Sequence, residues 1–395
     1  LVSVIREAAV EHKPLEVIGG GSRRGLGRPV SADHVLDMSG FSGIRTYEPE
    51  ELVMIAGAGT PVTEISMALK EHGQMLAFEP LDHSGLLGTG EGPGTLGGMV
   101  GVGASGPRRF KAGSARDFVL GVKGVSGRAE AFKTGGRVVK NVTGYDMSKL
   151  VTGSFGTLAA LTEINLKLAP APEKIYTLLI YGLDDESAVA AMRDAAGSAF
   201  EPTGLAHLPK VVVGMSSVDY VSDSGQTVTA IRVEGPKISV RHRITSLATL
   251  IGEGHRVEEL HSSRSLTLWR EIRDCVPLLE PTSAHIWRVS MAPTDASALV
   301  SEVRPDAHYF DWAGGLSWFA FNEPETKAAL QAAVLQQAVA RKGGHAALVR
   351  APLEARSMLN VFQPQEPGLA ALTARVKESF DPLRILNPGR MYKKV

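Results

Sequence analysis

The pattern of apolar and polar positions divides the chain into two parts of different character. In the first part, short apolar runs alternate with polar residues and are separated by glycines, as in a sheet with one buried face. In the second part, strand-like runs alternate with longer runs at helical spacing. Pro170 and Pro172 lie where the pattern changes. We therefore predict an α+β protein of two domains, because a chain of 395 residues is long enough for each part to bury its own core.

The first part predicts a mainly antiparallel sheet with a few helices. Helices are expected over 2–11, 60–69 and 146–152, and strands over 15–18, 35–38, 52–56, 119–125, 129–132, 138–139 and 158–168. Between these elements, residues 78–106 have the composition of a long loop. A loop of this length in a compact domain is typical of a functional segment.

The second part contains a repeat of strand, helix, strand, strand, helix, strand. The first copy is expected over 175–181, 186–196, 204–208, 227–233, 239–251 and 256–259, and the second over 286–291, 295–303, 307–310, 316–321, 325–342 and 346–349. A linking helix is expected over 264–276. Two ferredoxin-like units in series predict a wide antiparallel sheet with helices on one face.

Charge and cysteine content exclude several classes of function. Lys plus Arg equals Asp plus Glu, at 42 each, so no overall field draws the chain to nucleic acid or to an acidic membrane. The single cysteine, Cys275, excludes an internal disulfide, an iron–sulfur cluster held by this chain alone and a cysteine zinc site. No apolar run approaches the ~20 residues of a membrane span, and the N-terminus lacks a signal-peptide core. We expect a cytoplasmic protein.

Glycines concentrate in two segments. Residues 19–27 follow a predicted strand, and a glycine turn there presents consecutive amide N–H groups that can bind a pyrophosphate. A tight turn without a ligand is the alternative. The second segment ends in GVGASG at 101–106, which matches G-x-G-x-x-G. We do not interpret it as a Rossmann site, because no helical periodicity follows and no strand–helix–strand unit surrounds it.

Several separated motifs carry a family resemblance. They are GGGS at 19–22, GTLGG at 94–98, SGPRR at 105–109, RDFVLG at 116–121, KNVTGYD at 140–146, FDP at 380–382 and NPGR at 387–390. In this order they resemble the FAD-binding subunits of bacterial glycolate oxidase, within the vanillyl-alcohol oxidase superfamily and its PCMH-type FAD-binding domain. The resemblance spans nearly the whole chain.

The resemblance implies a domain organisation and a cofactor. A PCMH-type FAD-binding domain of two α/β subdomains is expected over 1–170, a cap domain carrying the sheet of two ferredoxin-like repeats over 171–365, and a segment returning to the FAD domain over 366–395. The FAD is expected to be noncovalent, so His83 is not expected to carry it. The implied cofactor-binding residues are Gly19, Gly20, Gly21, Ser22, Gly27, Pro80, Gly94, Thr95, Leu96, Gly97, Gly98, Ser105, Arg116, Asp117, Gly156, Ile164 and Asn387.

A 2-hydroxy-acid substrate would need a group for its carboxylate and a base for its hydroxyl proton. Arginine suits a carboxylate through its planar pair of donors, and histidine suits proton abstraction near neutral pH. The candidates are Arg273, Arg288 and Arg350 as cations and His345 as the base or a substrate contact, with surface or salt-bridge roles as the alternative for each arginine. No metal site is expected, because the H-x-G-D-G-N-x-H segment of catalytic D-2-hydroxy-acid dehydrogenases of the superfamily does not occur.

The resemblance implies an FAD-dependent oxidoreductase in a glycolate oxidase (glycolate dehydrogenase) complex. As one subunit of that complex, this chain would oxidise glycolate or a related 2-hydroxy acid to the 2-oxo acid and pass electrons to an iron–sulfur subunit. The complex would also contain a larger FAD-containing subunit. The alternative is a non-catalytic subunit of the same complex that binds FAD for a structural or electron-relay role. An NADPH-fed flavin reductase is a third hypothesis that the terminal motifs disfavour. Peripheral contact with the inner membrane is expected only through partners.

Overall fold

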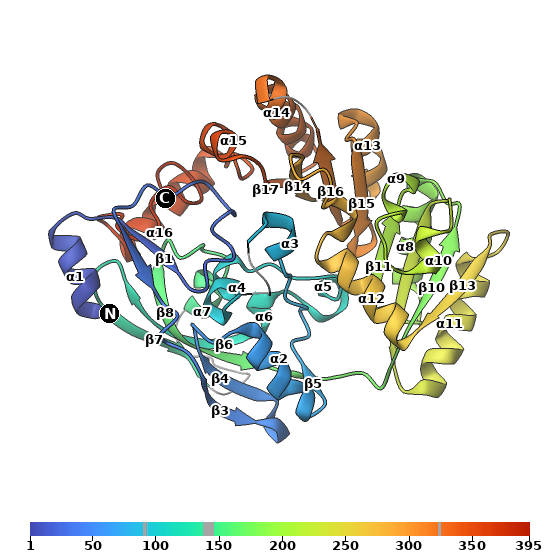
Figure 1. The fold of residues 1–395 in the computed structure, drawn as a ribbon, viewed down its shortest axis with the longest axis horizontal. Helices are drawn as coiled ribbons and strands as arrows, with labels where there is room; N and C mark the ends of the chain where they lie inside the picture. Colours follow the sequence, from blue (N-terminus) through green and yellow to red (C-terminus); the bar gives the residue numbers. More distant parts are fainter. Residues whose placement is uncertain (90–91, 93, 137–145, 323–324) are drawn as a thin grey trace. The chain divides into compact units, whose positions relative to one another are not determined.

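A computed structural model describes residues 1–89, 92, 94–136, 146–322 and 325–395, which divide into two compact units (Figure 1). Unit 1 comprises Leu1–Ser105, Ser114–Ala171 and Pro364–Val395, and unit 2 comprises Gly106–Gly113 and Pro172–Gln363. The segment Gly106–Gly113 therefore groups with unit 2, although the sequence assigned all of 1–170 to one domain. In the described ranges, no helix is long and apolar enough to cross a membrane.

Unit 1 is built on a five-stranded antiparallel sheet with the strand order β3-β4-β8-β6-β7. The strands are β3 (Ile44–Glu48), β4 (Val53–Gly57), β8 (Ala159–Lys167), β6 (Val119–Ser126) and β7 (Ala131–Gly135). All five residues of β4 are buried, because it is a central strand covered on both faces. The strand expected over 138–139 and most of the KNVTGYD motif lie outside the described residues.

A second layer of unit 1 joins the beginning of the chain to its end. Strand β1 (Leu15–Ile18) pairs in parallel with β2 (His34–Asp37), and Leu15 also forms a parallel bridge to Leu386. Helix α1 (Val2–Val10) buries Ile5 and Ala8 in a cluster with Ile385 and Leu386. Helix α16 (Pro367–Phe380) leads into this C-terminal strand-like segment. The segment Pro364–Val395 belongs to unit 1.

Short helices complete unit 1. They are α2 (Val62–Glu71), α3 (Ser84–Leu87), α4 (Leu96–Val102), α6 (Ala115–Phe118) and α7 (Met147–Val151), with η1 (Pro49–Glu51) and the strand pair β5 (Gln74–Met75) and β9 (Ala169–Pro170). The prediction of one long loop over 78–106 was wrong, since α3 and α4 lie within it. Helix α4 forms despite its glycines because the hydroxyl of Thr95 caps it, accepting a hydrogen bond from Gly98 N at 3.3 Å.

Unit 2 contains an eight-stranded antiparallel sheet with the order β13-β10-β12-β11-β15-β16-β14-β17. Its strands are β10 (Lys174–Tyr181), β11 (Gly204–Leu208), β12 (Val228–Gly235), β13 (Val257–His261), β14 (His285–Ser290), β15 (Ala307–Asp311), β16 (Leu316–Phe321) and β17 (His345–Arg350). Each repeat supplies four adjacent strands, and the two repeats join where His207 of β11 pairs with Phe310 of β15. The predicted pair of ferredoxin-like repeats and the α+β class are confirmed.

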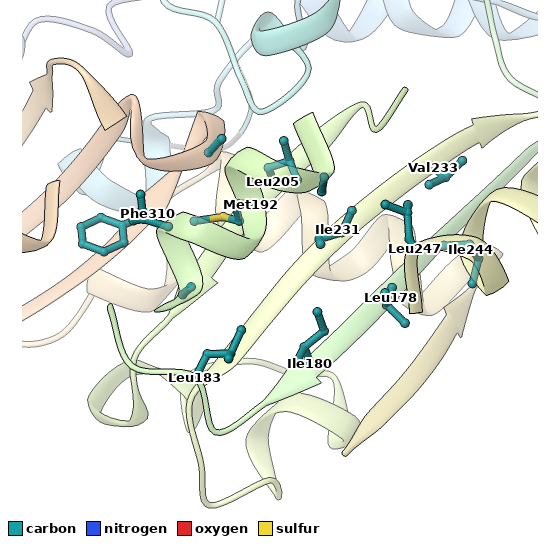
Figure 2. Packing of buried hydrophobic residues seen from close by; sticks show 14 of the residues in the cluster. Leu178, Ile180, Leu183, Met192, Leu205, Ile231, Val233, Ile244, Leu247 and Phe310 are labelled. Carbon is teal, nitrogen blue, oxygen red and sulfur yellow. The ribbon is translucent and has the colours of Figure 1, made fainter. Parts of the chain in front are cut away.

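Helices cover both faces of this sheet. They are α5 (Arg109–Ala112), α8 (Asp185–Gly197), α9 (Lys210–Val213), α10 (Asp219–Ser222), α11 (Lys237–Ile251), α12 (Ser262–Arg273), α13 (Ala296–Val303), α14 (Glu325–Arg341) and α15 (Leu353–Met358), with η2 (Val276–Leu278), η3 (Pro293–Asp295) and η4 (Trp312–Gly314). Figure 2 shows strand residues such as Leu178 and Ile231 packed against Met192 of α8 and Leu247 of α11. Linking helix α12 lies on the opposite face, where Trp269 Nε1 donates to Thr177 Oγ1 at 2.8 Å.

Candidate cofactor site

Unit 1 contains a cleft of about 820 Å³, with the space at its open mouth included. The end of β1, the glycine turn that follows it, α4, the residues after α7 and the C-terminal segment all contribute to its walls. The lining residues are Val17, Ile18, Gly19, Gly20, Gly21, Ser22, Arg23, Arg24, Met38, Ala58, Thr95, Gly97, Gly98, Gly101, Val102, Val151, Ser154, Phe155, Gly156, Ala159, Leu161, Asn387 and Arg390.

The glycine turn brings bare backbone to the cleft wall. A Cβ atom on Gly19 would lie 2.2 Å from Thr95 Oγ1, far inside contact distance. Only glycine therefore lets the turn approach the beginning of α4 this closely. Because Gly19, Gly20 and Gly21 carry no side chains, their part of the wall consists of peptide groups, which suit an anionic ligand that approaches the main chain.

Arg23 places a buried positive charge in the same wall. The residue is 9% exposed, and its guanidinium donates to Leu81 O at 3.1 Å while the buried Nε has no acceptor. Within the described residues it forms no ion pair. Burial lowers the pKa of Arg23 to about 10, an effect that Asp82 partly offsets. A buried cation that forms no ion pair within the described residues fits a ligand that carries phosphates.

Asn387 connects two walls of the cleft. Its Oδ1 accepts a hydrogen bond from Val17 N at 2.8 Å, and its Nδ2 donates to Phe155 O at 2.7 Å. Gly156 has φ +68, and a Cβ there would lie 2.7 Å from Asn387 Nδ2. The side chain of Asn387 thus fastens β1 to the residues that follow α7, and it needs a glycine opposite it.

The remaining lining is largely apolar. Met38 follows β2 directly, and Val102, Val151 and Leu161 come from α4, α7 and β8. A concave site with apolar walls and a few placed polar groups is the usual form of a cofactor pocket. Together with Arg23 and the peptide wall, this lining fits a ligand that has a flat ring system at one part and phosphates at another, as FAD has.

The structure brings together some of the residues predicted to bind the cofactor and leaves others outside the lining. Those in the lining are Gly19, Gly20, Gly21, Ser22, Thr95, Gly97, Gly98, Gly156 and Asn387. Those outside it are Gly27, Pro80, Gly94, Leu96, Ser105, Arg116, Asp117 and Ile164. Several of the second group have visible structural tasks, since Ser105 Oγ accepts from Ala115 N at 2.9 Å and Asp117 caps α6 through Ser114.

Sequence reasoning missed other lining residues. Arg390 belongs to a motif that pointed to the site, and its Nη2 donates to Arg23 O at 2.9 Å. Ser154 and Phe155 precede Gly156 in a turn whose glycine was the available signal. Arg108 and Arg109, by contrast, belong to unit 2, where Arg108 Nε donates to Glu234 Oε2 at 3.0 Å. The SGPRR motif is thus divided after Ser105.

The predicted catalytic residues all lie in unit 2. Strand register places Ser290 opposite His345 and Ala347 opposite Arg288, so Arg288 and His345 are diagonal neighbours on one face of the sheet. His345 is exposed at the first position of edge strand β17. Arg273 instead pairs with Asp274, with Nη2 to Oδ2 at 2.6 Å. Arg350 is buried and donates to four backbone carbonyls, those of Leu278, Leu279, Pro281 and Ala284.

Arg288 has an unusual electrostatic setting. Its guanidinium lies 4.9 Å from the centre of the Trp312 ring, and that of Arg109 lies 4.3 Å from the same ring. Among the described residues, Arg288 has no hydrogen bond and no ion pair. Dense packing and then the nearby Arg109 charge lower the pKa of Arg288 to about 10. Two cations beside one indole favour the binding of an anion.

Metal ligands are not grouped in the part of the chain that the structure describes. No three His, Cys, Asp or Glu side chains there are arranged to hold a metal ion.

Known proteins are similar to this chain in sequence and in fold. A family model described as an FAD binding domain matches residues 1–135. The chain is 32% identical to glycolate oxidase subunit GlcE of Escherichia coli (strain K12), over 99% of this chain and 96% of that protein. It is 24% identical to glycolate oxidase subunit GlcD of Bacillus subtilis (strain 168), over 100% of this chain and 87% of that protein.

The fold is also that of a solved alkyldihydroxyacetonephosphate synthase, with a TM-score of 0.69 at 17% identity over 98% of this chain and 74% of that one. The prediction of FAD as the cofactor and of an FAD-dependent oxidoreductase is confirmed. The match at 32% identity over nearly the whole length of both chains is sufficient to assign the family. The chain belongs to the family of FAD-binding glycolate oxidase subunits, within the flavoproteins that have a PCMH-type FAD-binding domain.

Proposed function

We propose that this chain is the FAD-binding subunit of a glycolate oxidase complex and oxidises glycolate or a related 2-hydroxy acid to the 2-oxo acid. Two relatives are named as glycolate oxidase subunits, which supports this substrate class. The cofactor cleft lies in unit 1, and the candidate residues for binding the acid belong to unit 2. The observation that carries the proposal is the Arg288 guanidinium, which makes no ion pair and no hydrogen bond within the described residues and lies beside a second cation, Arg109.

Bound FAD supplies a two-electron acceptor for the hydrogen on the substrate carbon. Arg288 binds the substrate carboxylate through its planar pair of N–H donors and so fixes the orientation of the acid. The stacked Trp312 ring holds the guanidinium in place, and the charge of Arg109 makes the surroundings favourable for an anion. His345, on the same face as Arg288, receives the hydroxyl proton.

Partners complete the reaction. Electrons pass from this chain to an iron–sulfur subunit, and a larger FAD-containing subunit belongs to the same complex. A heteromeric assembly agrees with the subunit names of the relatives. We place the complex in the cytoplasm, with contact to the inner membrane made by other subunits.

A second candidate is a subunit that binds FAD for structure or electron relay without turning over substrate. The exposure of His345 favours it, because no described residue makes a hydrogen bond that would orient the imidazole. A general base needs such an orientation and a short distance to the proton it removes.

Anaerobic reduction distinguishes the two candidates. The purified chain, loaded with FAD, is mixed with glycolate or D-lactate while the absorption band of oxidised flavin is followed. Loss of the band in the wild-type chain, with much slower loss in Arg288→Met and His345→Ala, is the expected result. A flavin that stays oxidised until the partner subunits are added would contradict catalysis by this chain and support the relay role.

A further inference from the structure

A buried ion pair lies at the end of helix α16, just before the segment that supplies Asn387 to the cofactor cleft. Lys377 of α16 and Asp381 both have fully buried side chains, and Lys377 Nζ lies 2.7 Å from Asp381 Oδ2. Nζ also donates to Thr157 O at 2.6 Å and to Leu386 O at 3.0 Å. Since an ammonium group has three N–H donors, every donor of Lys377 is used.

The electrostatics keep this pair together. Burial lowers the pKa of Lys377, and the carboxylate of Asp381 acts in the opposite direction. Asp381 in turn accepts hydrogen bonds from Ile385 N at 3.0 Å and Leu386 N at 2.9 Å. The ion pair therefore fixes the backbone of the turn over 381–386, because it binds both ends of that turn.

The next residue along the chain is Asn387, which fastens two walls of the cleft. It holds φ +43, a conformation that the turn before it must impose, since non-glycine residues adopt it at a cost. The hydrogen bonds of its amide to Val17 N and Phe155 O depend on this backbone position. Lys377 also reaches the second wall directly, because Thr157 lies two residues after Phe155.

We propose that Lys377 is a positioning residue for FAD, which holds the turn over 381–387 so that Asn387 keeps both walls of the cleft in place. FAD binding and docking of the C-terminal segment then favour each other, because a ligand that binds only the docked state stabilises that state. This coupling concerns the assembly of the cofactor site and goes beyond the proposed oxidation of a 2-hydroxy acid.

Trypsin offers a local probe of docking. Arg384 is exposed and lies inside the turn, so cleavage after it requires the turn to open. FAD is expected to slow this cleavage in the wild-type chain by about tenfold or more. Lys377→Met keeps the length of the side chain but removes its three donors. We expect the apoprotein of this variant to be cut about tenfold faster and to bind FAD with a dissociation constant raised about tenfold.

Two further variants separate positioning from general stability. Leu69→Ala destabilises unit 1 from α2, at a fully buried site outside the cleft lining, and should leave FAD affinity of the folded protein within about twofold of wild type. Asn387→Ala removes the amide that joins the two cleft walls, so it should weaken FAD binding. It leaves the Lys377–Asp381 pair intact, so the apoprotein should be cleaved after Arg384 as slowly as the wild-type apoprotein. This variant keeps the test available if Lys377→Met does not fold.

Three results would overturn the coupling. They are FAD affinity at the wild-type level in both Lys377→Met and Asn387→Ala, an equal loss of affinity in Leu69→Ala, and cleavage of the wild-type chain that FAD does not slow. A wild-type chain that binds no FAD would instead contradict the assignment of the cleft, and the coupling with it. A chain that binds FAD but does not oxidise glycolate would contradict only the proposed function.

Discussion

Unit 1 and unit 2 prepare their binding surfaces in different ways. In unit 1, the wall formed by 19–21 is peptide backbone. The space in front of it is limited, since a Cβ on Gly19 would lie 2.2 Å from Thr95 Oγ1. In unit 2, the surroundings of Trp312 in η4 carry two charged side chains, Arg109 from α5 and Arg288 from β14. The first surface is therefore sensitive to added atoms, and the second to removed or unbalanced charge.

The largest expected effect is the loss of the charge that holds the 106–113 segment to unit 2. Glu234 binds Arg108 and lies 3.7 Å from Arg232, and the three side chains are 6%, 8% and 2% exposed. Glu234→Gln leaves two buried guanidinium groups without their shared carboxylate, so the free energy of unfolding should fall by about 3–5 kcal/mol. Urea denaturation followed by tryptophan emission measures the free energy of unfolding of unit 2, which contains all four tryptophans.

The matched control for that variant is Glu201→Gln. Glu201 pairs with Lys111 of the same segment, but both side chains are largely exposed. Its removal should leave the urea midpoint unchanged. Equal losses in the two variants would show that burial is not what gives the Arg108 contact its importance.

A smaller effect is expected from Arg288, and it appears in kinetics. Arg288→Met removes the cation proposed to bind the substrate carboxylate, so kcat/KM for glycolate should fall by about 10- to 100-fold, which corresponds to about 1.5–3 kcal/mol for hydrogen bonds to a charged group. Arg273→Met should change kcat/KM much less, because the Arg273 guanidinium is occupied by Asp274. Steady-state kinetics of both variants measure kcat/KM. An equal loss in both would contradict a substrate-binding role for Arg288.

Adding one methyl group tests unit 1. Gly19→Ala should raise the dissociation constant of FAD by about 10- to 100-fold, since relieving such an overlap costs about 1–3 kcal/mol. Gly20→Ala is the control, because its Cβ would lie 3.6 Å from Thr95 Cγ2, an ordinary contact. Titration of the apoproteins with FAD gives both constants. If the two variants bind equally well, space at the glycine turn does not limit binding.

The smallest effect is a pH dependence of unit 2. Burial lowers the pKa of His207 from its ordinary 6.5. For Asp185, burial would raise the pKa, but the neighbouring His207 imidazole and the hydrogen-bonded His308 imidazole outweigh it and hold the pKa well below 3.8. Both groups bind protons more readily in the unfolded chain. Unit 2 should therefore lose stability as the pH falls below about 6.5, by at most about 1.4 kcal/mol per pH unit for His207, with the Asp185 contribution lost below about 3.8.

Urea midpoints followed by tryptophan emission at about pH 7 and about pH 5 measure this pH dependence of stability. His207→Gln should flatten the dependence, whereas His242→Gln, at an exposed position of α11, should not. A midpoint that rises on acidification would reverse the sign and exclude a neutral buried His207.

Sequence patterns predicted the elements of unit 2 well because their signals are local. The strands expected over 204–208 and 316–321 coincide with β11 and β16, each an apolar run bounded by glycine, proline or polar residues. The glycine turn at 19–22 and Asn387 were also identified from local motifs, and the structure places them in the cleft lining.

Features that depend on distant contacts could not be read in this way. A lysine in a helix normally faces water, and one of the acceptors that allow Lys377 to be buried is Thr157 O, 220 positions away. The position of Gly106 depends on Trp312 Nε1, which donates to its carbonyl at 3.0 Å across 206 positions. His345 shows a related limit, since alternation of apolar residues does not distinguish an edge strand from a central one.

The interleaving of the two units along the chain has a consequence for biosynthesis. Residues 106–113 leave the ribosome before the sheet that receives them exists, and unit 1 lacks α16 and the segment around Asn387 until all of 172–363 has been made. At about 5–20 residues per second, this delay lasts about 10–40 s. During that time the glycine turn lacks the C-terminal segment around Asn387, so the nascent chain cannot complete its flavin pocket. Cofactor binding therefore becomes a late, post-translational step.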